Sequence, residues 1–298
     1  MIRAMGVLWG VCLIAALLLP DVPAGAAAGG ASVTVTDALG RRVILPALPR
    51  RIVSVAPSVT EILFALGLEA RIVGLSSADD HPAEQVAGKP RVGGVILDVE
   101  RIISLRPQLI LGVASLQRDQ LERLIAFGLP VVAVDAATLP EVYAQIAWIG
   151  RLTGANEAAA RLIATMRQKE QRVAAAVRGR PRRQVYVEVS ADPMITAGEG
   201  TVVSDLVTRA GGVNVFGDVT GWVQVSEEAV LRRDPEVMVA AYPRGRPLIL
   251  RRRWQGVRAI RTGRVGEVPA SLVSRPGPRL VDGLHALAEI IHPEAFGR

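Results

Sequence analysis

The stretch that decides the fold is residues 156–181, which read NEAAARLIATMRQKEQRVAAAVRGRP. We predict one helix over residues 157–178. Asn156 is a good N-cap for this helix, and Gly179 with Pro181 ends it. Apolar side chains recur at helical spacing opposite a wide charged face, at Ala159, Leu162, Met166, Val173 and Val177. A helix of about 22 residues is roughly 33 Å long, which fits a strut between two domains. The alternative is an ordinary packing helix inside one domain, and the flanking sequence distinguishes the two.

The length and composition indicate a globular chain with two domains. The chain has 298 residues, and single hydrophobic cores usually stop growing at about 250–300 residues. Hydrophobic residues make up 50% and charged residues 21%, which argues against extended disorder. The formal net charge is +7. The basic residues are nevertheless spread along the chain, without zinc-finger spacing or an aromatic RNA-binding motif, so no nucleic-acid partner is expected.

Residues 1–26 are expected to be a signal peptide. Arg3 gives a positive start, residues 6–19 form an apolar run, and Ala24-Gly25-Ala26 resembles a cleavage site. The run is shorter than the ~20 residues of a membrane-spanning helix, so we expect export and cleavage, with a retained anchor as the alternative. The single cysteine, Cys12, lies in this segment. The exported protein would therefore have no thiol for a disulfide, a metal site or a nucleophile.

Residues 33–138 predict an N-terminal α/β lobe, called here the first lobe. It opens with a hairpin over residues 33–43, after which strands alternate with single helices, as in a parallel sheet covered on both faces. The expected strands are 51–55, 72–75, 109–112 and 131–134, and the expected helices are 60–67, 99–105 and 117–127, with Pro57-Ser58 as a turn and 76–90 as a loop. Ligands of such sheets bind beyond the carboxyl ends of the strands. The candidate walls of a site are therefore the loops after Val55, Leu75, Gly112 and Val134.

Residues 139–180 are expected to connect this lobe to a second one through a helix over 139–153 and the bridging helix over 157–178. Residues 181–298, called here the second lobe, repeat the α/β pattern. The expected strands are 184–189, 237–241 and 265–268, and the expected helices are 201–210, 226–232, 251–257 and 278–291. The predicted fold is α/β, with two Rossmann-like lobes bridged by a single long helix and a ligand cleft between them.

Five stretches of the chain carry a resemblance to a known family. They read DALGR (37–41), RIVSVAPSVTEIL (51–63), DVERIISLRPQL (98–109), AGGVN (210–214) and RPGPRLVDGL (275–284). In order and spacing they resemble the periplasmic solute-binding proteins of ABC importers for corrinoids, haem and iron–siderophores, whose two lobes are bridged by one long helix. Residues 76–82, 220–228 and 275–279 are closest to the vitamin B12-binding members.

The resemblance, together with the position of the loops, suggests which residues contact the ligand. The candidates are Pro57, Ser58, Asp80, His81, Trp222 and Arg275. His81 stands where B12 binders commonly present a tyrosine. It could stack on a corrin edge, donate a hydrogen bond or serve as an axial metal ligand, and a plain surface histidine is the alternative.

The other two prominent candidates also have ordinary alternatives. Trp222 is expected in a loop, where a flat ligand would cover it, but it could equally pack under that loop. Arg275 offers guanidinium donors to a ligand or is a solvated loop arginine. The run Arg251-Arg252-Arg253 is expected to be mostly solvated, since three consecutive residues cannot face one way.

Glu100 and Glu228 both follow a cap at the start of a predicted helix, which by itself explains an acidic residue there. Family members use one such carboxylate on each lobe to dock on arginines of the permease. The resemblance therefore implies that Glu100 and Glu228 contact the transmembrane subunits of the transporter.

The resulting interpretation is a monomeric extracytoplasmic binding protein that delivers a corrinoid to an ABC permease, with haem or an iron–siderophore as the alternative ligand. An enzyme is not expected, because the chain has no Gly-x-Ser-x-Gly elbow and its three histidines are scattered. No resident cofactor or metal is expected either, since no paired metal-ligand spacing occurs.

Overall fold

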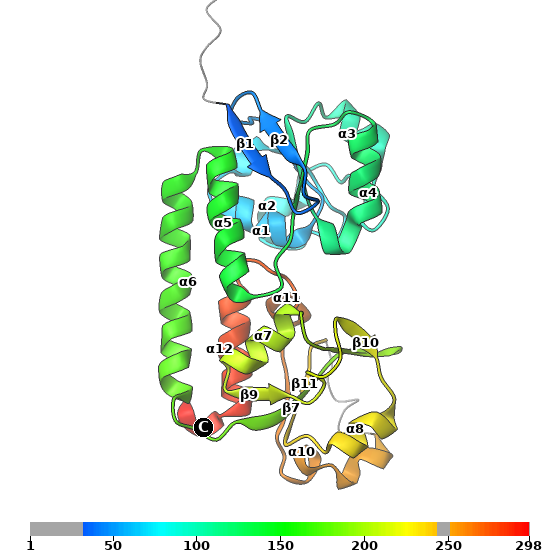
Figure 1. Ribbon diagram of the computed structural model, residues 1–298, viewed down its shortest axis with the longest axis vertical. Helices are drawn as coiled ribbons and strands as arrows, with labels where there is room; N and C mark the ends of the chain where they lie inside the picture. Colours follow the sequence, from blue (N-terminus) through cyan, green and yellow to red (C-terminus); the bar gives the residue numbers. More distant parts are fainter. Residues whose placement is uncertain (1–31, 243–250, 298) are drawn as a thin grey trace, which may run out of the picture. The chain divides into compact units, whose positions relative to one another are not determined.

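The computed structural model describes residues 32–242 and 251–297 (Figure 1). The expected signal peptide at residues 1–26 lies outside the described residues. The chain first forms the predicted hairpin, in which β1 (Val33–Thr36) pairs antiparallel with β2 (Arg42–Leu45). The Asp37 carboxylate closes the turn by accepting the backbone N–H groups of Leu39 at 3.0 Å and Arg41 at 2.9 Å. Gly40 supplies the left-handed conformation that this turn requires, with φ of 76°.

The first lobe contains a parallel sheet of four strands in the order β4-β3-β5-β6. The strands are β3 (Ile52–Ser54), β4 (Ile72–Leu75), β5 (Leu109–Val113) and β6 (Val131–Val134). Every residue of β3, β5 and β6 is buried. This explains why these strands read as continuous apolar runs rather than alternating ones.

Five helices and one 3₁₀ turn accompany this sheet. They are α1 (Pro57–Ala65), η1 (Glu69–Arg71), α2 (Ala83–Ala87), α3 (Val99–Ser104), α4 (Ala114–Ala126) and α5 (Leu139–Thr153). The prediction of a turn at Pro57-Ser58 is wrong, because Pro57 begins α1. Proline suits this position, since its missing N–H would be unpaired there anyway. The segment expected as a loop over residues 76–90 contains α2.

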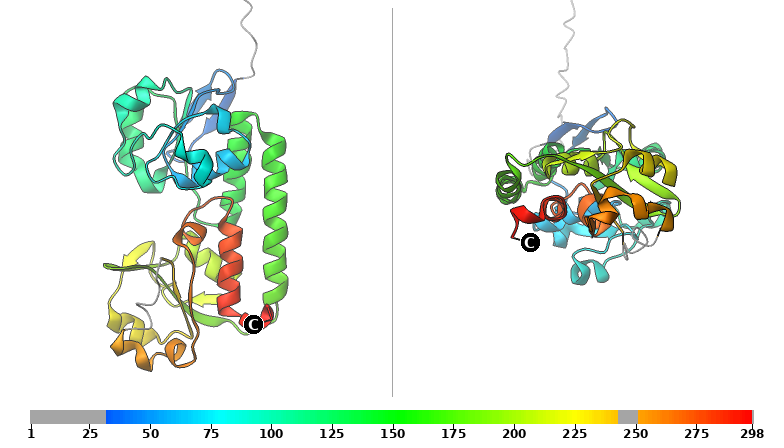
Figure 2. Two further views of the ribbon diagram at one scale, coloured as in Figure 1. Left: turned by 180° about the vertical axis from the view of Figure 1, so that it is seen from behind. Right: turned by 90° about the horizontal axis from the view of Figure 1, so that it is seen from below.

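Helix α6 (Asn156–Val177) confirms the predicted long helix to within one residue at each end. The expected Asn156 cap is wrong, because Ala155 is the N-cap residue and no side chain caps this end. Figures 1 and 2 show α6 alongside α5 and α12, and it contacts both. The Glu170 carboxylate on α6 accepts hydrogen bonds from Tyr143 of α5 at 2.8 Å and from Arg209 of α7 at 2.6 Å. The helix therefore joins elements that lie on both sides of it in the sequence.

The second lobe is built on a mixed sheet in the order β10-β8-β7-β11-β12, with β9 pairing β7. The strands are β7 (Arg183–Ala191), β8 (Met194–Ala197), β9 (Gly212–Asn214), β10 (Trp222–Gln224), β11 (Val237–Ala240) and β12 (Val265–Glu267). The β7, β11 and β12 strands run parallel as predicted. The sequence did not predict β8 and β10, which pair antiparallel, so the expectation that Trp222 lies in a loop is wrong.

The remaining helical elements lie around this sheet. They are α7 (Val202–Arg209), α8 (Glu227–Arg233), η2 (Arg252–Gly256), α10 (Arg258–Arg261), α11 (Ala270–Val273), α12 (Leu280–Ile291) and η3 (Pro293–Ala295). Ser226 caps α8 as predicted, by accepting the N–H of Ala229. Trp254 is fully buried beside Tyr186 in the core of the second lobe. Among the described residues, no helix is both long and apolar enough to cross a membrane.

Candidate ligand site

The loop Arg275–Arg279 of the second lobe is bonded to two carboxylates of the first lobe. The Arg275 guanidinium donates to both oxygens of Asp80, at 2.5 and 3.1 Å, and to Glu61 at 3.3 Å. Arg279 donates twice to Glu61, at 3.0 and 2.6 Å. Glu61 is 4% exposed, so its charge is compensated almost entirely by these two arginines. We call Glu61, Asp80, Arg275 and Arg279 the interlobe ion-pair cluster.

The backbone of this loop also approaches the first turn of α1 closely. A Cβ atom at Gly277 would lie 3.3 Å from the Ser58 carbonyl oxygen, a contact tighter than side chains normally make. Ser58 is buried, and Pro57 beside it is half-buried. The structure thus brings together four of the predicted ligand residues, Pro57, Ser58, Asp80 and Arg275, although Arg275 and Asp80 are already paired with each other.

The loop before α2 contributes Asp79, Asp80 and His81. Asp79 is 6% exposed, and neither of its carboxylate oxygens has a hydrogen-bond partner among the described residues. Burial raises the pKa of Asp79 to about 6, although Arg91 and Arg275 oppose this shift. The neighbouring Asp80 behaves oppositely, because its hydrogen bond to Arg275 lowers its pKa. His81 is half-buried and makes no hydrogen bond or ion pair with the described parts of the chain, so its imidazole is free to bind.

Trp222 begins β10 and is 50% exposed. It lies opposite Ala197 of β8 in the sheet. The alternative of a tryptophan packed under a loop is therefore wrong, and half of a large apolar side chain is left in contact with solvent. Within the described residues, no hydrogen bond or ring contact joins Trp222 to His81 or Arg275. Its assignment to the same site stays a prediction.

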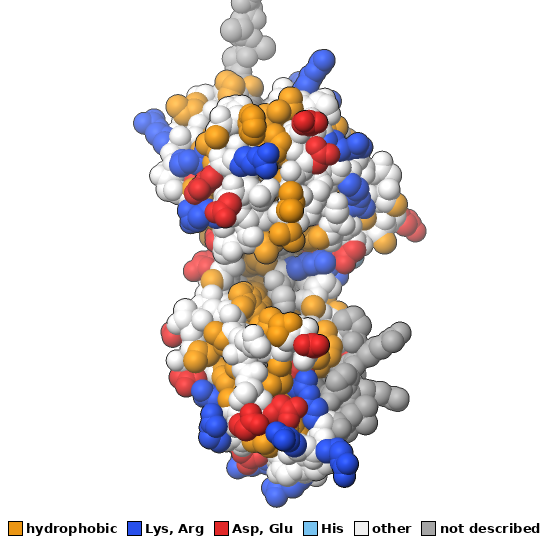
Figure 3. All heavy atoms as spheres, turned by 90° about the vertical axis from the view of Figure 1, so that its right-hand side faces the viewer, with side chains coloured by type: hydrophobic (Ala, Val, Ile, Leu, Met, Phe, Trp, Pro, Cys, Tyr) orange, Lys and Arg blue, Asp and Glu red, His pale blue; other side chains and the backbone are white. Residues whose placement is uncertain are grey.

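Figure 3 shows one face of the molecule. Between the two lobes this face is hollowed, and apolar side chains gather in the hollow. The chemistry of the surrounding loops is that of a binding site. The residues described above supply carboxylates, guanidinium groups, one imidazole and, at the start of β10, one exposed indole. In the described part of the chain, no three histidine, cysteine or acidic side chains come together in a way that could hold a metal ion.

Two members of the interlobe ion-pair cluster, Glu61 and Arg279, were not singled out by the sequence analysis. Both lie in quoted motifs, and Glu61 interrupts an apolar run as a lone charge. That interruption was the available signal, since a charged residue in a buried helix face needs a partner. Nothing in the sequence could identify the partner, which lies 218 residues away.

The run Arg251-Arg252-Arg253 was expected to be mostly solvated, and Arg252 and Arg253 are exposed, but Arg251 departs from this expectation. Its side chain is 16% exposed and donates to both oxygens of the fully buried Glu188, at 2.6 and 3.0 Å. Its guanidinium also stacks over the Trp254 ring at 4.3 Å. A buried carboxylate therefore draws this arginine into the second lobe.

The two predicted docking residues occupy similar local positions. Glu100 is the second residue of α3 and Glu228 the second residue of α8, and both are exposed. Hydrogen bonds at the helix start lower the pKa of Glu228, and Arg253 lies 3.2 Å away. Both residues are thus exposed, as docking requires. Both also lie at a helix start, where an acidic residue is stabilising even without a docking role.

Comparison with known proteins identifies matches along most of the chain. Residues 52–272 match the family described as periplasmic binding protein. The chain is 35% identical over 273 residues to an uncharacterized ABC transporter substrate-binding lipoprotein, YvrC, of Bacillus subtilis strain 168, covering 89% of this chain and 87% of that protein. It is 30% identical to the vitamin B12-binding protein of Pectobacterium carotovorum strain PC1, covering 79% of this chain and 86% of that one.

A solved structure shows the same architecture. The periplasmic heme-binding protein RhuT from Roseiflexus sp. RS-1, in its apo form, superposes with a TM-score of 0.73 at 25% identity, covering 83% of this chain and 99% of that one. The relatives thus agree on the two-lobed fold, while the ligands in their names differ.

Proposed function

Because the chain belongs to the periplasmic binding protein family, whose members bind solutes for ABC importers rather than catalyse reactions, we propose that it carries a corrinoid of the vitamin B12 type. The half-exposed indole of Trp222 is the observation that best supports this ligand. A flat aromatic surface can bury the apolar edge of a macrocycle, at ~25 cal/mol per Å² of apolar area. The 30% identity to a vitamin B12-binding relative supports the same class of ligand.

The arginine predicted to contact the ligand retains unused donors. Its guanidinium has five N–H groups. Three of them, on the two terminal nitrogens, donate to Glu61 and Asp80. Two N–H groups of Arg275, the Nε–H and one on Nη2, are left for an amide or phosphate oxygen of the corrinoid. In this proposal Asp80 positions Arg275, while Pro57, Ser58 and His81 line the wall contributed by the first lobe.

Haem is the second candidate, and the observation that favours it is the free imidazole of His81. Haem iron usually takes a protein axial ligand, whereas a corrinoid arrives with its cobalt already ligated. The heme-binding relative of similar fold supports this alternative, and a ferric siderophore is a third member of the same class. The transported chelate would be a substrate, and no resident cofactor is part of the proposal.

The experiment that distinguishes these ligands is a titration of the purified protein with cyanocobalamin, hemin and ferrichrome. Binding is measured by equilibrium dialysis and by absorbance. We expect cyanocobalamin to bind most tightly. Trp222→Ala should weaken its binding by about 1–3 kcal/mol, the range for a large buried aromatic contact. Phe127→Ala is the matched control, because Phe127 is a similarly exposed aromatic, at 57%, on the first lobe. Tighter binding of hemin, lost in His81→Ala, would reassign the protein to haem.

We further propose that the protein is exported through residues 1–26 and docks on its permease through Glu100 and Glu228. Reversing both carboxylates to lysine should leave cyanocobalamin affinity unchanged and abolish uptake, since like charges at an interface cost several kcal/mol. Asp119→Lys on α4 is a control for added positive charge. Normal uptake by the double variant would mean that both glutamates only stabilise their helix starts and do not contact the permease.

A further inference from the structure

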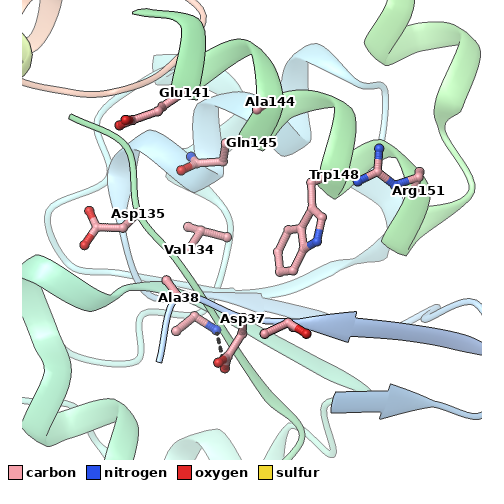
Figure 4. Close-up of a pocket in the computed structure, with 11 residues that line it drawn as sticks. Asp37, Ala38, Val134, Asp135, Glu141, Ala144, Gln145, Trp148 and Arg151 are labelled. Carbon is pink, nitrogen blue, oxygen red and sulfur yellow. Dashed lines mark hydrogen bonds between the residues drawn. The ribbon is translucent and has the colours of Figure 1, made fainter. Parts of the chain in front are cut away.

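The first lobe carries a groove between the hairpin, the end of β6 and helix α5, and none of its lining residues belongs to the interlobe ion-pair cluster (Figure 4). The groove encloses about 340 Å³, which lies within the range of small-ligand sites. Its polar lining comes from Asp37, Asp135, Glu141, Gln145 and Arg151, and its largest apolar surface is Trp148.

Gln145 is the residue that indicates a ligand. Its side chain is 6% exposed, and neither its amide nitrogen nor its amide oxygen has a hydrogen-bond partner among the described residues. Figure 4 shows its carboxamide directed from α5 into the groove. A buried amide without partners is costly, so a molecule with an adjacent donor and acceptor would stabilise this site.

The charges around Gln145 are separated along α5. Glu141, Gln145, Trp148 and Arg151 follow the spacing of one helix face, and Glu141 and Arg151 are ten positions apart, or about 15 Å. Figure 4 shows Asp135 and Glu141 toward one end of the groove and Arg151 toward the other.

The end charges are not neutralised by the protein. Asp135 accepts hydrogen bonds from the backbone and side chain of Ser115 and from the Ala136 N–H, and Glu141 accepts the Ala137 N–H. In the described ranges, neither carboxylate has a basic partner and Arg151 has no acidic one. Asp37 differs, because Arg41 pairs with it at 2.6 Å. The groove is therefore acidic at one end and basic at the other.

We propose that this groove binds a short extended peptide with free termini, of about four residues. A peptide of this length spans roughly 13–14 Å, at about 3.3–3.6 Å per residue, which approaches the distance between Glu141 and Arg151. Its ammonium group pairs with Asp135 and Glu141, and its carboxylate pairs with Arg151. One of its peptide groups forms the two missing hydrogen bonds of Gln145, and a side chain packs on Trp148. None of the residues proposed for the corrinoid site lines this groove, and the inference does not depend on the proposed function.

The test is isothermal titration calorimetry with tetraalanine, N-acetyl-tetraalanine and tetraalanine amide. We expect tetraalanine to bind, and each blocked form to bind at least about tenfold more weakly, because it lacks one charge-assisted contact. Arg151→Gln should abolish the preference for tetraalanine over its amide while keeping the preference over the acetylated form. Equal binding of all three peptides would show that the charged termini are not recognised, and either this outcome or no binding at all would overturn the proposal.

Gln145→Leu tests the amide pairing directly. It should weaken tetraalanine binding about tenfold without lowering the thermal midpoint, since it removes an unpaired buried amide. Arg161→Gln, which removes an exposed arginine of α6, is the matched control for Arg151→Gln and should bind tetraalanine normally. Saturation with cyanocobalamin should not displace the peptide. Displacement would show that the groove is part of the transport site and would contradict a separate peptide site.

Discussion

Two buried glutamates, one in each lobe, are compensated by arginine in different ways. Glu188 of the second lobe is fully buried and is bound entirely by residues of its own lobe, namely Tyr186, Tyr242 and Arg251. Glu61 of the first lobe is 4% exposed and is bound by Arg275 and Arg279 of the second. A carboxylate is bound by arginine in both places, but only the ion pairs of Glu61 join the two lobes.

The difference decides what each carboxylate can stabilise. Removing one partner of a buried ion pair leaves the other charge desolvated, unless that charge can reach water. Arg251 is stacked on Trp254 and is 16% exposed, so it has little freedom to become solvated. Arg275 and Arg279 are each 23% exposed and lie in a loop, so they can regain water if the lobes separate slightly. We infer that Glu188 stabilises one lobe, whereas Glu61 stabilises the arrangement of the two.

The largest effect is expected at Glu188. Glu188→Gln should lower the free energy of unfolding by about 3–5 kcal/mol, the range for breaking a buried ion pair from one side. Urea denaturation followed by circular dichroism measures this change. Asp218→Asn is the control, because Asp218 pairs with Arg233 at the surface and should have no measurable effect. A Glu188 variant as stable as that control would mean that the two tyrosines alone hold this site.

A third buried carboxylate, Asp79, has no ion-pair partner among the described residues, and its burial determines the expected effect of pH. Its pKa is raised from 3.8 to about 6, so the folded protein favours its protonated form. The stability it contributes is fully present below pH 3.8 and is lost as the pH rises through about 6. By pH 7 this loss amounts to about 2–3 kcal/mol, since one pKa unit corresponds to ~1.4 kcal/mol.

Asp79→Asn should remove this pH dependence. We therefore expect the difference in unfolding free energy between the wild-type protein and the variant to change by about 2–3 kcal/mol between pH 4 and pH 7, in favour of the variant. Parallel urea titrations at several pH values measure it, with Asp119→Asn, at an exposed position of α4, as the control. A difference that does not vary with pH would mean that Asp79 is hydrated or bonded in solution.

The comparison also shows which parts of the fold were accessible from the sequence. The bounds of α6 were predicted within one residue, because Gly179 and Pro181 end a helix through local chemistry. The parallel strands were predicted because residues buried on both faces form apolar runs. The antiparallel strands β8 and β10 were missed because they are partly exposed and do not form the continuous buried runs by which the parallel strands were predicted.

The site was less accessible, for a different reason. Arg275 and Asp80 were each predicted to contact a ligand, and the structure shows that they also pair with each other, which the sequence did not predict. Arg251 was assigned to solvent because its partner Glu188 lies 63 residues away. Charge pairing across such separations depends on tertiary structure, and a single sequence gives the charges without the pairs.

The smallest change is expected at Glu61. Glu61→Gln removes the negative charge shared by Arg275 and Arg279 but keeps a side chain that can accept one hydrogen bond. Because both arginines can become solvated, the loss in unfolding free energy should be about 1–2 kcal/mol, less than at Glu188. The more specific readout is the arrangement of the lobes, since Arg275 keeps only its bonds to Asp80.

Small-angle scattering of the ligand-free protein should therefore give a larger radius of gyration for Glu61→Gln than for the wild-type protein, while Glu188→Gln measured under folding conditions should not differ from wild type. Glu84→Gln, at an exposed position of α2, controls for the loss of a charge on the same lobe. If Glu61→Gln instead costs as much as Glu188→Gln and leaves the radius unchanged, the interlobe arginines remain desolvated without their partner. The contact between the lobes would then be as rigid as the interior of the second lobe.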